Sequence, residues 1–145
     1  MRVEVVSAAH LAAIADIEAA CFAEPWSEQA LSLLVGDGAF GLACIDEATG
    51  HVIAYLGVLI ALDEGQITNV ATHPLWRRRG CADALLHALR RACAARGLCT
   101  LSLEVRKSNE VAIALYRKHG FAVAGERPRF YTSPVESALV MVCNL

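Results

Sequence analysis

A short basic segment lies where a loop enters a long helical pattern, and it has the composition of a phosphate-binding site. Its six residues are Arg77, Arg78, Arg79, Gly80, Cys81 and Ala82. The first backbone N–H groups of a helix lack partners within the helix and carry the positive end of its dipole, so they bind anions. Gly80 and Ala82 leave room for phosphate oxygens, and the arginines add charge. The segment indicates a pyrophosphate site, with a solvated basic turn as the alternative, because such a short motif is a weak signal.

Glu104 is a candidate for proton transfer, on a segment whose two faces differ in character. Apolar residues alternate there with the polar residues Ser102, Glu104 and Arg106. Such alternation is typical of a strand that is buried on one side. A carboxylate on the polar side could act as a general base through a water molecule. The alternative is an exposed strand carboxylate without a chemical role.

Tyr116 is a second candidate, and it falls in a helical pattern that follows this strand. Asn109, Ala112 and Tyr116 are three and four residues apart, so they share one face of the expected helix. This spacing can direct the hydroxyl group of Tyr116 and the amide of Asn109 to one site. The alternative is a core aromatic residue whose hydroxyl group reaches the surface.

Hydrophobic periodicity predicts the elements that must position these residues. The expected strands are residues 3–6, 40–45, 52–60, 66–72, 99–105, 121–125 and 138–142. The expected helices are residues 8–22, 27–36, 81–95 and 109–118. This order predicts an α/β (α+β) protein with a single mixed sheet and helices on both faces, in one domain spanning residues 1–145. The lack of a Gly-x-Gly-x-x-Gly motif argues against a doubly wound dinucleotide-binding domain.

Composition and charge narrow the class of protein further. Hydrophobic residues make up 56% of the 145 residues, but no apolar run approaches the roughly 18 residues that cross a bilayer. The first residues lack the apolar segment of a signal peptide, so we expect a cytoplasmic protein without a membrane partner. The net charge of −2 does not favour direct binding of nucleic acid.

The cysteines and histidines do not have the spacing of a metal site. The histidines form no zinc-type cluster, and the cysteines include no Cys-x-x-Cys pair. We therefore expect no metal and interpret most of the cysteines as small, reduced core residues. They are Cys21, Cys44, Cys81, Cys93, Cys99 and Cys143.

Several of these segments fall in an order that matches a known family. In chain order they are the strand 66–72, Arg77-x-x-Gly80-x-Ala82, Leu103-Glu104-Val105-Arg106-x-Ser108-Asn109 and Ala114-Leu115-Tyr116-x-x-x-Gly120-Phe121. Together they resemble the GNAT superfamily of acetyl-CoA-dependent N-acetyltransferases. An earlier segment, Phe22-x-x-Pro25-Trp26-Ser27, is similar to the RimI-type ribosomal-protein N-terminal alanine acetyltransferases within it. The resemblance covers nearly the whole chain.

The resemblance implies a GNAT fold with a splayed acetyl-CoA cleft. Such a fold has a mostly antiparallel sheet of about six to seven strands flanked by about four helices. The pantetheine arm of acetyl-CoA is expected to lie along a central strand like an added strand, often beside a β-bulge. The implied cofactor-binding residues are Val70, Ala71, Thr72, Arg77, Arg78, Arg79, Gly80, Cys81, Ala82, Asp83, Asn109 and Tyr116.

The resemblance also implies a direct transfer of acetyl to the N-terminal α-amine of a protein, with the N-terminal Ala of ribosomal protein S18 as the expected acceptor. Glu104 matches the family's general base, and Tyr116 matches the general acid that protonates the departing thiolate. An α-amine has a pKa near 7.7–8.0, so it needs only modest deprotonation. An oxyanion would be stabilised by a backbone N–H near Val70. Trp26, Phe130 and Tyr131 are expected to line the acceptor groove, although Trp26 could instead be a packing anchor.

Two positions depart from the family pattern. Ser137 replaces the second acid of a Glu-Asp-Ala motif, which leaves the peptide specificity open. Asp83 favours a helix N-terminus but would repel a phosphate bound there. The alternatives are therefore an acetyltransferase that acts on a small-molecule amine or a lysine, and a CoA-binding module without catalysis.

Overall fold

The computed structural model describes residues 1–145, and a single seven-stranded sheet runs through it in the order β1-β2-β3-β4-β5-β7-β6. The strands are β1 (Arg2–Val5), β2 (Ala39–Ile45), β3 (Val52–Ala61), β4 (Glu64–Thr72), β5 (Thr100–Arg106), β6 (Ala122–Thr132) and β7 (Val135–Asn144). β4 and β5 pair in parallel, and every other neighbouring pair is antiparallel. The prediction of a mixed, mostly antiparallel sheet is confirmed.

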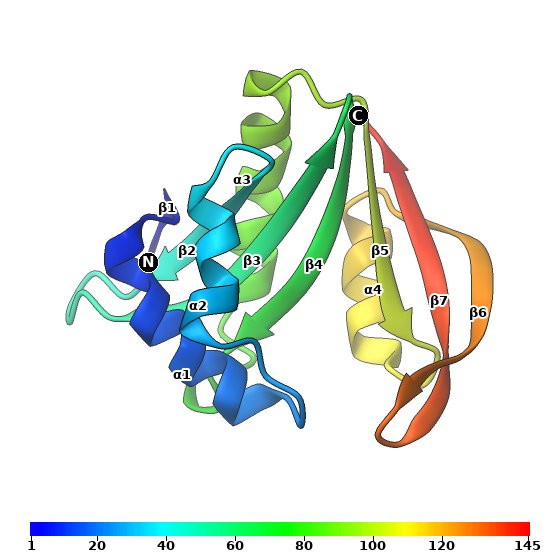
Figure 1. The fold of residues 1–145 in the computed structure, drawn as a ribbon, viewed down its shortest axis with the longest axis horizontal. Coiled ribbons are helices and arrows are strands. Elements are labelled where there is room, and N and C mark those ends of the chain that lie inside the picture. Colours follow the sequence, from blue (N-terminus) through cyan, green and yellow to red (C-terminus); the bar gives the residue numbers. More distant parts are fainter.

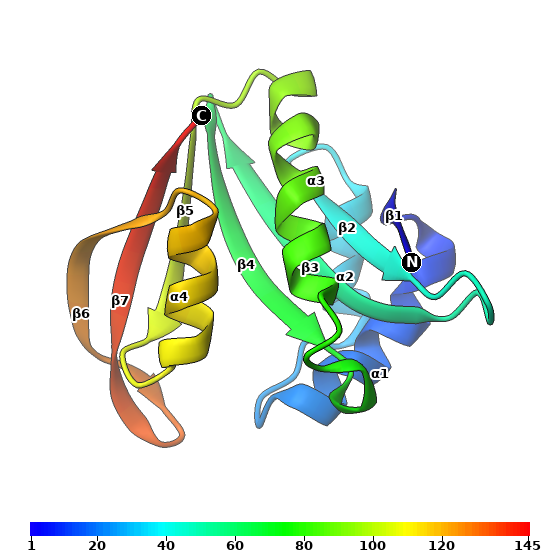
Figure 2. The same ribbon diagram turned by 180° about the vertical axis from the view of Figure 1, so that it is seen from behind.

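Helices cover both faces of the sheet (Figures 1 and 2). The α-helices are α1 (Leu11–Cys21), α2 (Glu28–Leu31), α3 (Cys81–Ala95) and α4 (Glu110–Lys118), and the 3-10 segments are η1 (Ala8–His10), η2 (Ser32–Val35) and η3 (Pro74–Trp76). α1 and α2 bury one apolar core against the sheet, which includes Ile14 and Ile17. α3 and α4 bury a second core on the opposite face, which includes Leu85 and Ile113. No helix is both long and apolar enough to cross a bilayer.

Local signals set the ends of the helices. α3 begins and ends at the expected residues, after Gly80 with φ of 81° and before Gly97 with φ of 69°. Glycine favours this left-handed conformation because it has no Cβ. Ser27 and Asn109 cap α2 and α4 through side-chain oxygens that accept backbone N–H bonds at 3.1 and 3.2 Å. The expected second helix is shorter than predicted, because its latter half is the 3-10 segment η2.

β4 and β5 are joined only where they begin. Their pairing covers Glu64–Thr100, Gly65–Leu101 and Gln66–Ser102, and beyond it the strands diverge (Figure 1). On its other side β4 contains a β-bulge: Leu56 pairs with Val70 and Val58 with Ile67, so two β4 residues lie opposite Gly57. A bulge bends its strand and increases the local twist. The sheet is therefore split into two halves that open as a V.

Gly57 allows the bulged strand to approach β3. A Cβ atom added at this residue would lie 2.6 Å from the side-chain oxygen of Thr68 and 3.0 Å from a methyl group of Leu34. Thr68 is one of the two bulge residues, and Leu34 belongs to the core beneath α2. The absence of a side chain at Gly57 therefore accommodates both the bulge and the helix packing.

The last hairpin is longer than the sequence predicted. The expected strands covered residues 121–125 and 138–142 only, but β6 continues to Thr132 and turns into β7 through Ser133 and Pro134. The register of β6 is irregular between Arg127 and Tyr131. Most β6 side chains are exposed, so the strand lacks the apolar alternation by which strands are recognised. Pairing with β7, rather than burial, makes this segment a strand.

We expect Gly57→Ala to lower the free energy of unfolding by about 1–3 kcal/mol, because the added methyl group must displace Thr68 or Leu34. The matched control is Gly38→Ala, where an added Cβ has no neighbour within 4 Å. Urea denaturation of both variants measures the difference. Equal stabilities would show that the bulge does not require a glycine opposite it.

Candidate active site

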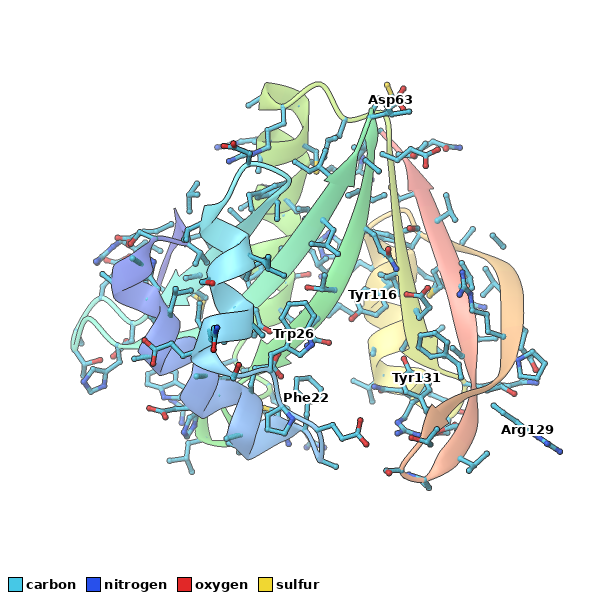
Figure 3. All side chains as sticks on the ribbon, viewed as in Figure 1. Phe22, Trp26, Asp63, Tyr116, Arg129 and Tyr131 are labelled. Atoms are coloured by element: carbon cyan, nitrogen blue, oxygen red, sulfur yellow. The ribbon has the colours of Figure 1, made fainter.

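The opening between β4 and β5 forms a cavity of about 580 Å³. Its walls come from β4 and β5, from α4 and its N-cap residue, from the connector between α1 and α2, and from the end of β6. Seven of the residues that the sequence marked as candidates lie on these walls, whereas Ala71, Thr72 and residues 77–83 do not. The seven are Trp26, Val70, Glu104, Asn109, Tyr116, Phe130 and Tyr131. Figure 3 shows Phe22 and Trp26 on one side of the opening, with Tyr116 and Tyr131 on the other.

Glu104 lies on β5 with 14% of its side chain exposed. Leu103 and Val105 are buried on the opposite face of the strand, which confirms the expected alternation. The Nε2 amide of Gln66 donates to both carboxylate oxygens, at 3.2 and 3.4 Å, and Nη2 of Arg127 lies 3.8 Å from Oε1. The carboxylate is thus held from both sides of the cleft.

Gln66 was not among the predicted site residues. It is the last β4 residue that pairs with β5, so its side chain lies at the closed end of the V. A polar amide in a segment that otherwise reads as a buried central strand was the only local signal for such a role. Gln66 and Glu104 are 38 positions apart in the sequence, so no local spacing pattern could reveal their contact.

Tyr116 lies on α4, 8% exposed, with its ring edge against Phe121 at 5.9 Å between centroids. Burial, with a smaller contribution from Tyr131, raises the pKa of Tyr116 to about 12. The hydroxyl group therefore carries its proton throughout the neutral range. Asn109 lines the same cavity, and its side-chain oxygen is engaged by the backbone N–H of Ala112.

The edge of β4 that faces the opening has free backbone groups. The N–H of His73 donates to the carbonyl of Ile53 on β3 at 2.8 Å. Because pairing groups alternate along an antiparallel strand, Ala71 also points its groups at β3, whereas Val70 and Thr72 point theirs away from it. The thiol of Cys21 donates to the carbonyl of Thr72 at 3.3 Å. Both backbone groups of Val70 and the N–H of Thr72 therefore point toward the opening, whereas the Thr72 carbonyl is engaged by Cys21 and Ala71 is directed at β3.

The basic loop before α3 is exposed and tightly wound. Arg78 has a φ of 62° and Gly80 a φ of 81°. A Cβ added at Gly80 would have no neighbour within 4 Å, so there is open space beside the helix N-terminus. The Arg79 guanidinium lies 4.8 Å from the centre of the Trp76 ring, and Nη2 of Arg77 lies 3.6 Å from the Cys21 sulfur.

The residues that open α3 differ in what they present to this space. The side chain of Cys81 is buried in the core, which leaves its backbone N–H as the group it could offer an anion. Ala82 is half-buried and small. Of the six cysteines, all free, four are buried, Cys21 is half-buried and Cys99 is exposed. The interpretation of most cysteines as core residues is confirmed.

Asp83 does not stand alone at the helix N-terminus. Lys118 donates to its carboxylate at 2.9 Å, and Nε2 of His119 lies 2.8 Å from the same oxygen. The hydrogen bond from Lys118, followed by the contact with His119, lowers the pKa of Asp83 below its ordinary value. The expected repulsion of a phosphate is therefore offset by two partners, and the contacts connect α3 to α4.

Hydrogen bonds of Arg106 and Glu136, which the sequence analysis did not predict, hold the β6–β7 hairpin at the cavity. Arg106 donates to the carbonyls of Pro134 and Ser133 at 2.9 and 3.1 Å, and to Glu136 at 3.2 Å. Glu136 accepts the N–H of Ser108 at 2.7 Å with its other oxygen. The guanidinium also lies 4.3 Å from the centre of the Tyr131 ring. The hairpin is thereby attached to the end of β5.

Aromatic side chains face each other across the mouth of the cavity. Trp26 packs against the core beneath α1 and α2, as expected of a packing anchor, and it also lines the cavity. Phe130 and Tyr131 meet edge to face at 5.0 Å between ring centroids. No group of three or more His, Cys, Asp and Glu side chains has the geometry to hold a metal ion.

Comparison with known proteins agrees with this geometry. The model of the acetyltransferase (GNAT) family matches residues 11–121. The chain belongs to this family, and it is an N-acetyltransferase. A relative from Salmonella typhimurium, named as a ribosomal protein bS18-alanine N-acetyltransferase, is 35% identical over 141 residues, which cover 96% of this chain and 94% of the relative.

Solved structures share the fold over nearly the whole chain. The crystal structure of the ribosomal-protein-S18-alanine N-acetyltransferase from Escherichia coli has a TM-score of 0.90 at 33% identity, covering 99% of this chain and 92% of that one. A phosphinothricin acetyltransferase from Sinorhizobium meliloti, solved with acetyl-CoA, has a TM-score of 0.84 at 22% identity and covers 99% and 88%. The second likeness shows the fold alone. Members of the GNAT family use acetyl-CoA.

We expect Asp83→Asn to lower the free energy of unfolding at neutral pH by about 1 kcal/mol or less, because the ion pair is largely exposed. The lowered pKa stabilises the folded state fully above the ordinary carboxyl value, and this contribution disappears as the pH falls through the folded-state value. Urea denaturation in an acid series should show the two proteins converging. Exposed Asp16→Asn is the control, and a difference that persists at the lowest pH would contradict the assignment.

Proposed function

We propose that the protein transfers the acetyl group of acetyl-CoA directly to the N-terminal α-amine of a protein, with the N-terminal Ala of ribosomal protein S18 as its acceptor. One observation carries the proposal: Glu104 and the protonated Tyr116 line one cavity beside the free edge of β4. The names of the relatives at 33–35% identity support this choice of acceptor. With a ribosomal protein as acceptor, a cytoplasmic location follows, and residues 1–145 act as one domain.

The chain has groups suited to each part of acetyl-CoA. The N–H and C=O groups of Val70 and the N–H of Thr72, which point away from β3, can pair with the amide-bearing pantetheine arm as an added strand. The N–H groups at the start of α3, from Gly80 onwards, can bind the pyrophosphate in the open space there. The rest of the proposed set is Ala71, Arg77, Arg78, Arg79, Cys81, Ala82, Asp83, Asn109 and Tyr116. Bound acetyl-CoA supplies the thioester that donates the acetyl group.

Different residues of the cavity carry out the separate proton transfers of the proposed reaction. Glu104, oriented by Gln66 and Arg127, accepts the proton of the acceptor ammonium through a water molecule. The backbone N–H of Val70, directed away from β3, stabilises the negative charge that develops on the thioester oxygen. Tyr116 donates its proton to the departing thiolate as the C–S bond breaks, and the second proton that the attacking nitrogen loses as the amide forms restores the hydroxyl group. No cysteine needs to carry the acetyl group, because the amine attacks the thioester itself.

The acceptor enters at the aromatic mouth of the cavity. Phe22 and Trp26 line the side of the α1–α2 connector, and Phe130 and Tyr131 line the side of the hairpin. Arg106 and Glu136 hold the hairpin in place through backbone contacts. Glu136 thus supplies an acid at this position even though Ser137 replaces the second one of the family pattern.

We expect Glu104→Gln and Tyr116→Phe each to lower kcat by about 100-fold or more, because each removes one positioned proton-transfer group. Since the pKa of Tyr116 is about 12, the wild-type enzyme should show no loss of activity from deprotonation of this group between pH 6 and 9. The matched control is Glu126→Gln, which removes a carboxylate that pairs with Lys107 outside the cavity. Wild-type turnover of both variants across that range would disprove the two roles.

The acceptor is tested with acetyl-CoA and short peptides that begin with Ala, Ser, Met or acetyl-Ala, following CoA release and product mass. We expect acetylation of a free N-terminal Ala and none of acetyl-Ala, because the reaction needs a free α-amine. Transfer only to free lysine or small amines would replace the protein N-terminus with another acceptor. Binding of acetyl-CoA without any transfer would disprove the catalytic function.

A further inference from the structure

Glu18 is a fully buried carboxylate outside the cavity. It lies on the sheet-facing side of α1 between apolar residues, with no exposed surface, and it is the one charged side chain in the buried core. Burying a carboxyl group costs several kcal/mol unless hydrogen bonds compensate. An apolar residue would pack α1 onto the sheet without that cost. A carboxyl group at this place therefore calls for an explanation beyond packing.

The carboxyl group binds one residue on each of two neighbouring strands. Its Oε1 atom accepts the hydroxyl proton of Tyr55 on β3 and the Nδ2 amide of Asn69 on β4, the latter at 2.7 Å. Its Oε2 atom has no partner. Tyr55 is itself fully buried, and burial raises the pKa of Glu18 above its ordinary value. All the hydrogen bonding of Glu18 is thus directed at β3 and the bulged strand.

Asn69 connects this buried group to the cavity. It is one of the two bulge residues opposite Gly57, it directly precedes Val70, and it lines the cavity. A bulge has no full ladder of backbone hydrogen bonds, so its conformation depends on other contacts. The bond from Asn69 to Glu18 ties the bulge to α1 at the point where β4 leaves β5.

We propose that Glu18 is a positioning residue for acetyl transfer: through Asn69 it holds the bulge of β4 so that the N–H of Val70 points into the cleft. This inference rests on the proposed function, in which that N–H stabilises the developing negative charge. Glu18 is not a catalytic residue, because it does not reach the cavity. Its effect passes entirely through the backbone of the bulge.

An exchange of donor and acceptor separates this role from simple packing. Asn69→Asp places a second carboxyl group against Glu18 and removes the amide donor. Glu18→Gln combined with Asn69→Asp restores the pairing in reverse, because an amide nitrogen at the place of Oε1 can donate one proton to the new carboxylate and the other to Tyr55. The exposed Asn144→Asp is the matched control.

The wild-type protein, Asn69→Asp, the double variant and Asn144→Asp are compared by kcat, by KM for acetyl-CoA and by hydrogen exchange of the backbone amides of residues 67–70. The measurements are made at a temperature at which circular dichroism shows that each protein is folded. We expect Asn69→Asp to lower kcat by at least about tenfold with a smaller change in KM, since small misplacements of transition-state groups are costly. The double variant should recover kcat to within about threefold of wild type and slow the exchange of these amides again.

Two results would overturn the positioning role: wild-type kcat in Asn69→Asp, or a double variant no more active than Asn69→Asp alone. If the wild-type protein acetylates no acceptor, the proposed function fails by itself. Hydrogen exchange then still decides whether Glu18 holds the bulge. Faster exchange in Asn69→Asp that the double variant reverses supports the link, and unchanged exchange refutes it.

Discussion

The separation of β4 from β5 is the constraint on which the rest of the structure depends. The two strands share three paired positions, after which the backbone groups on one edge of β4 have no strand to bind. Unpaired backbone groups in a partly buried cleft need a partner. A ligand that carries amides along an extended arm supplies donors and acceptors in the right order. The bulge, Gly57 opposite it and the buried contact between Glu18 and Asn69 all serve to keep this edge open.

The two halves of the sheet are held in a fixed relative position by side-chain contacts that connect them in two places. At the closed end, Gln66 reaches across to Glu104. Between the helices behind the sheet, Asp83 on α3 binds Lys118 and His119 at the end of α4. These contacts fix the distance between the two halves while the cleft between β4 and β5 stays open. A fixed opening matters for the proposed chemistry, because the backbone N–H of Val70 lies on the β4 half and Glu104 and Tyr116 lie on the β5 half, and all three must meet one ligand.

The cavity also shows how one fold assigns different chemistry to groups a few residues apart. Tyr116 is buried on α4, and burial keeps its proton in place. Glu104 lies on the polar side of its strand, where an amide and a guanidinium approach it. One group is thus kept neutral by the apolar core, and the other is held by polar contacts. The environment of each follows from the face of the element on which it lies.

The sequence by itself determined the elements and the chemical candidates. Hydrophobic periodicity and capping residues act within a few residues of the chain. They were enough to predict the bounds of α3, the cap at Asn109, the alternation along β5, and the candidates Glu104 and Tyr116. Only the tertiary structure decided which groups meet. Gln66 and Glu104 are 38 residues apart, Asp83 and His119 are 36, and Glu18 and Asn69 are 51. No local pattern encodes such pairs, because they depend on strand order and on how far the sheet opens. The same reason hid the full length of β6, which is a strand through its pairing with β7.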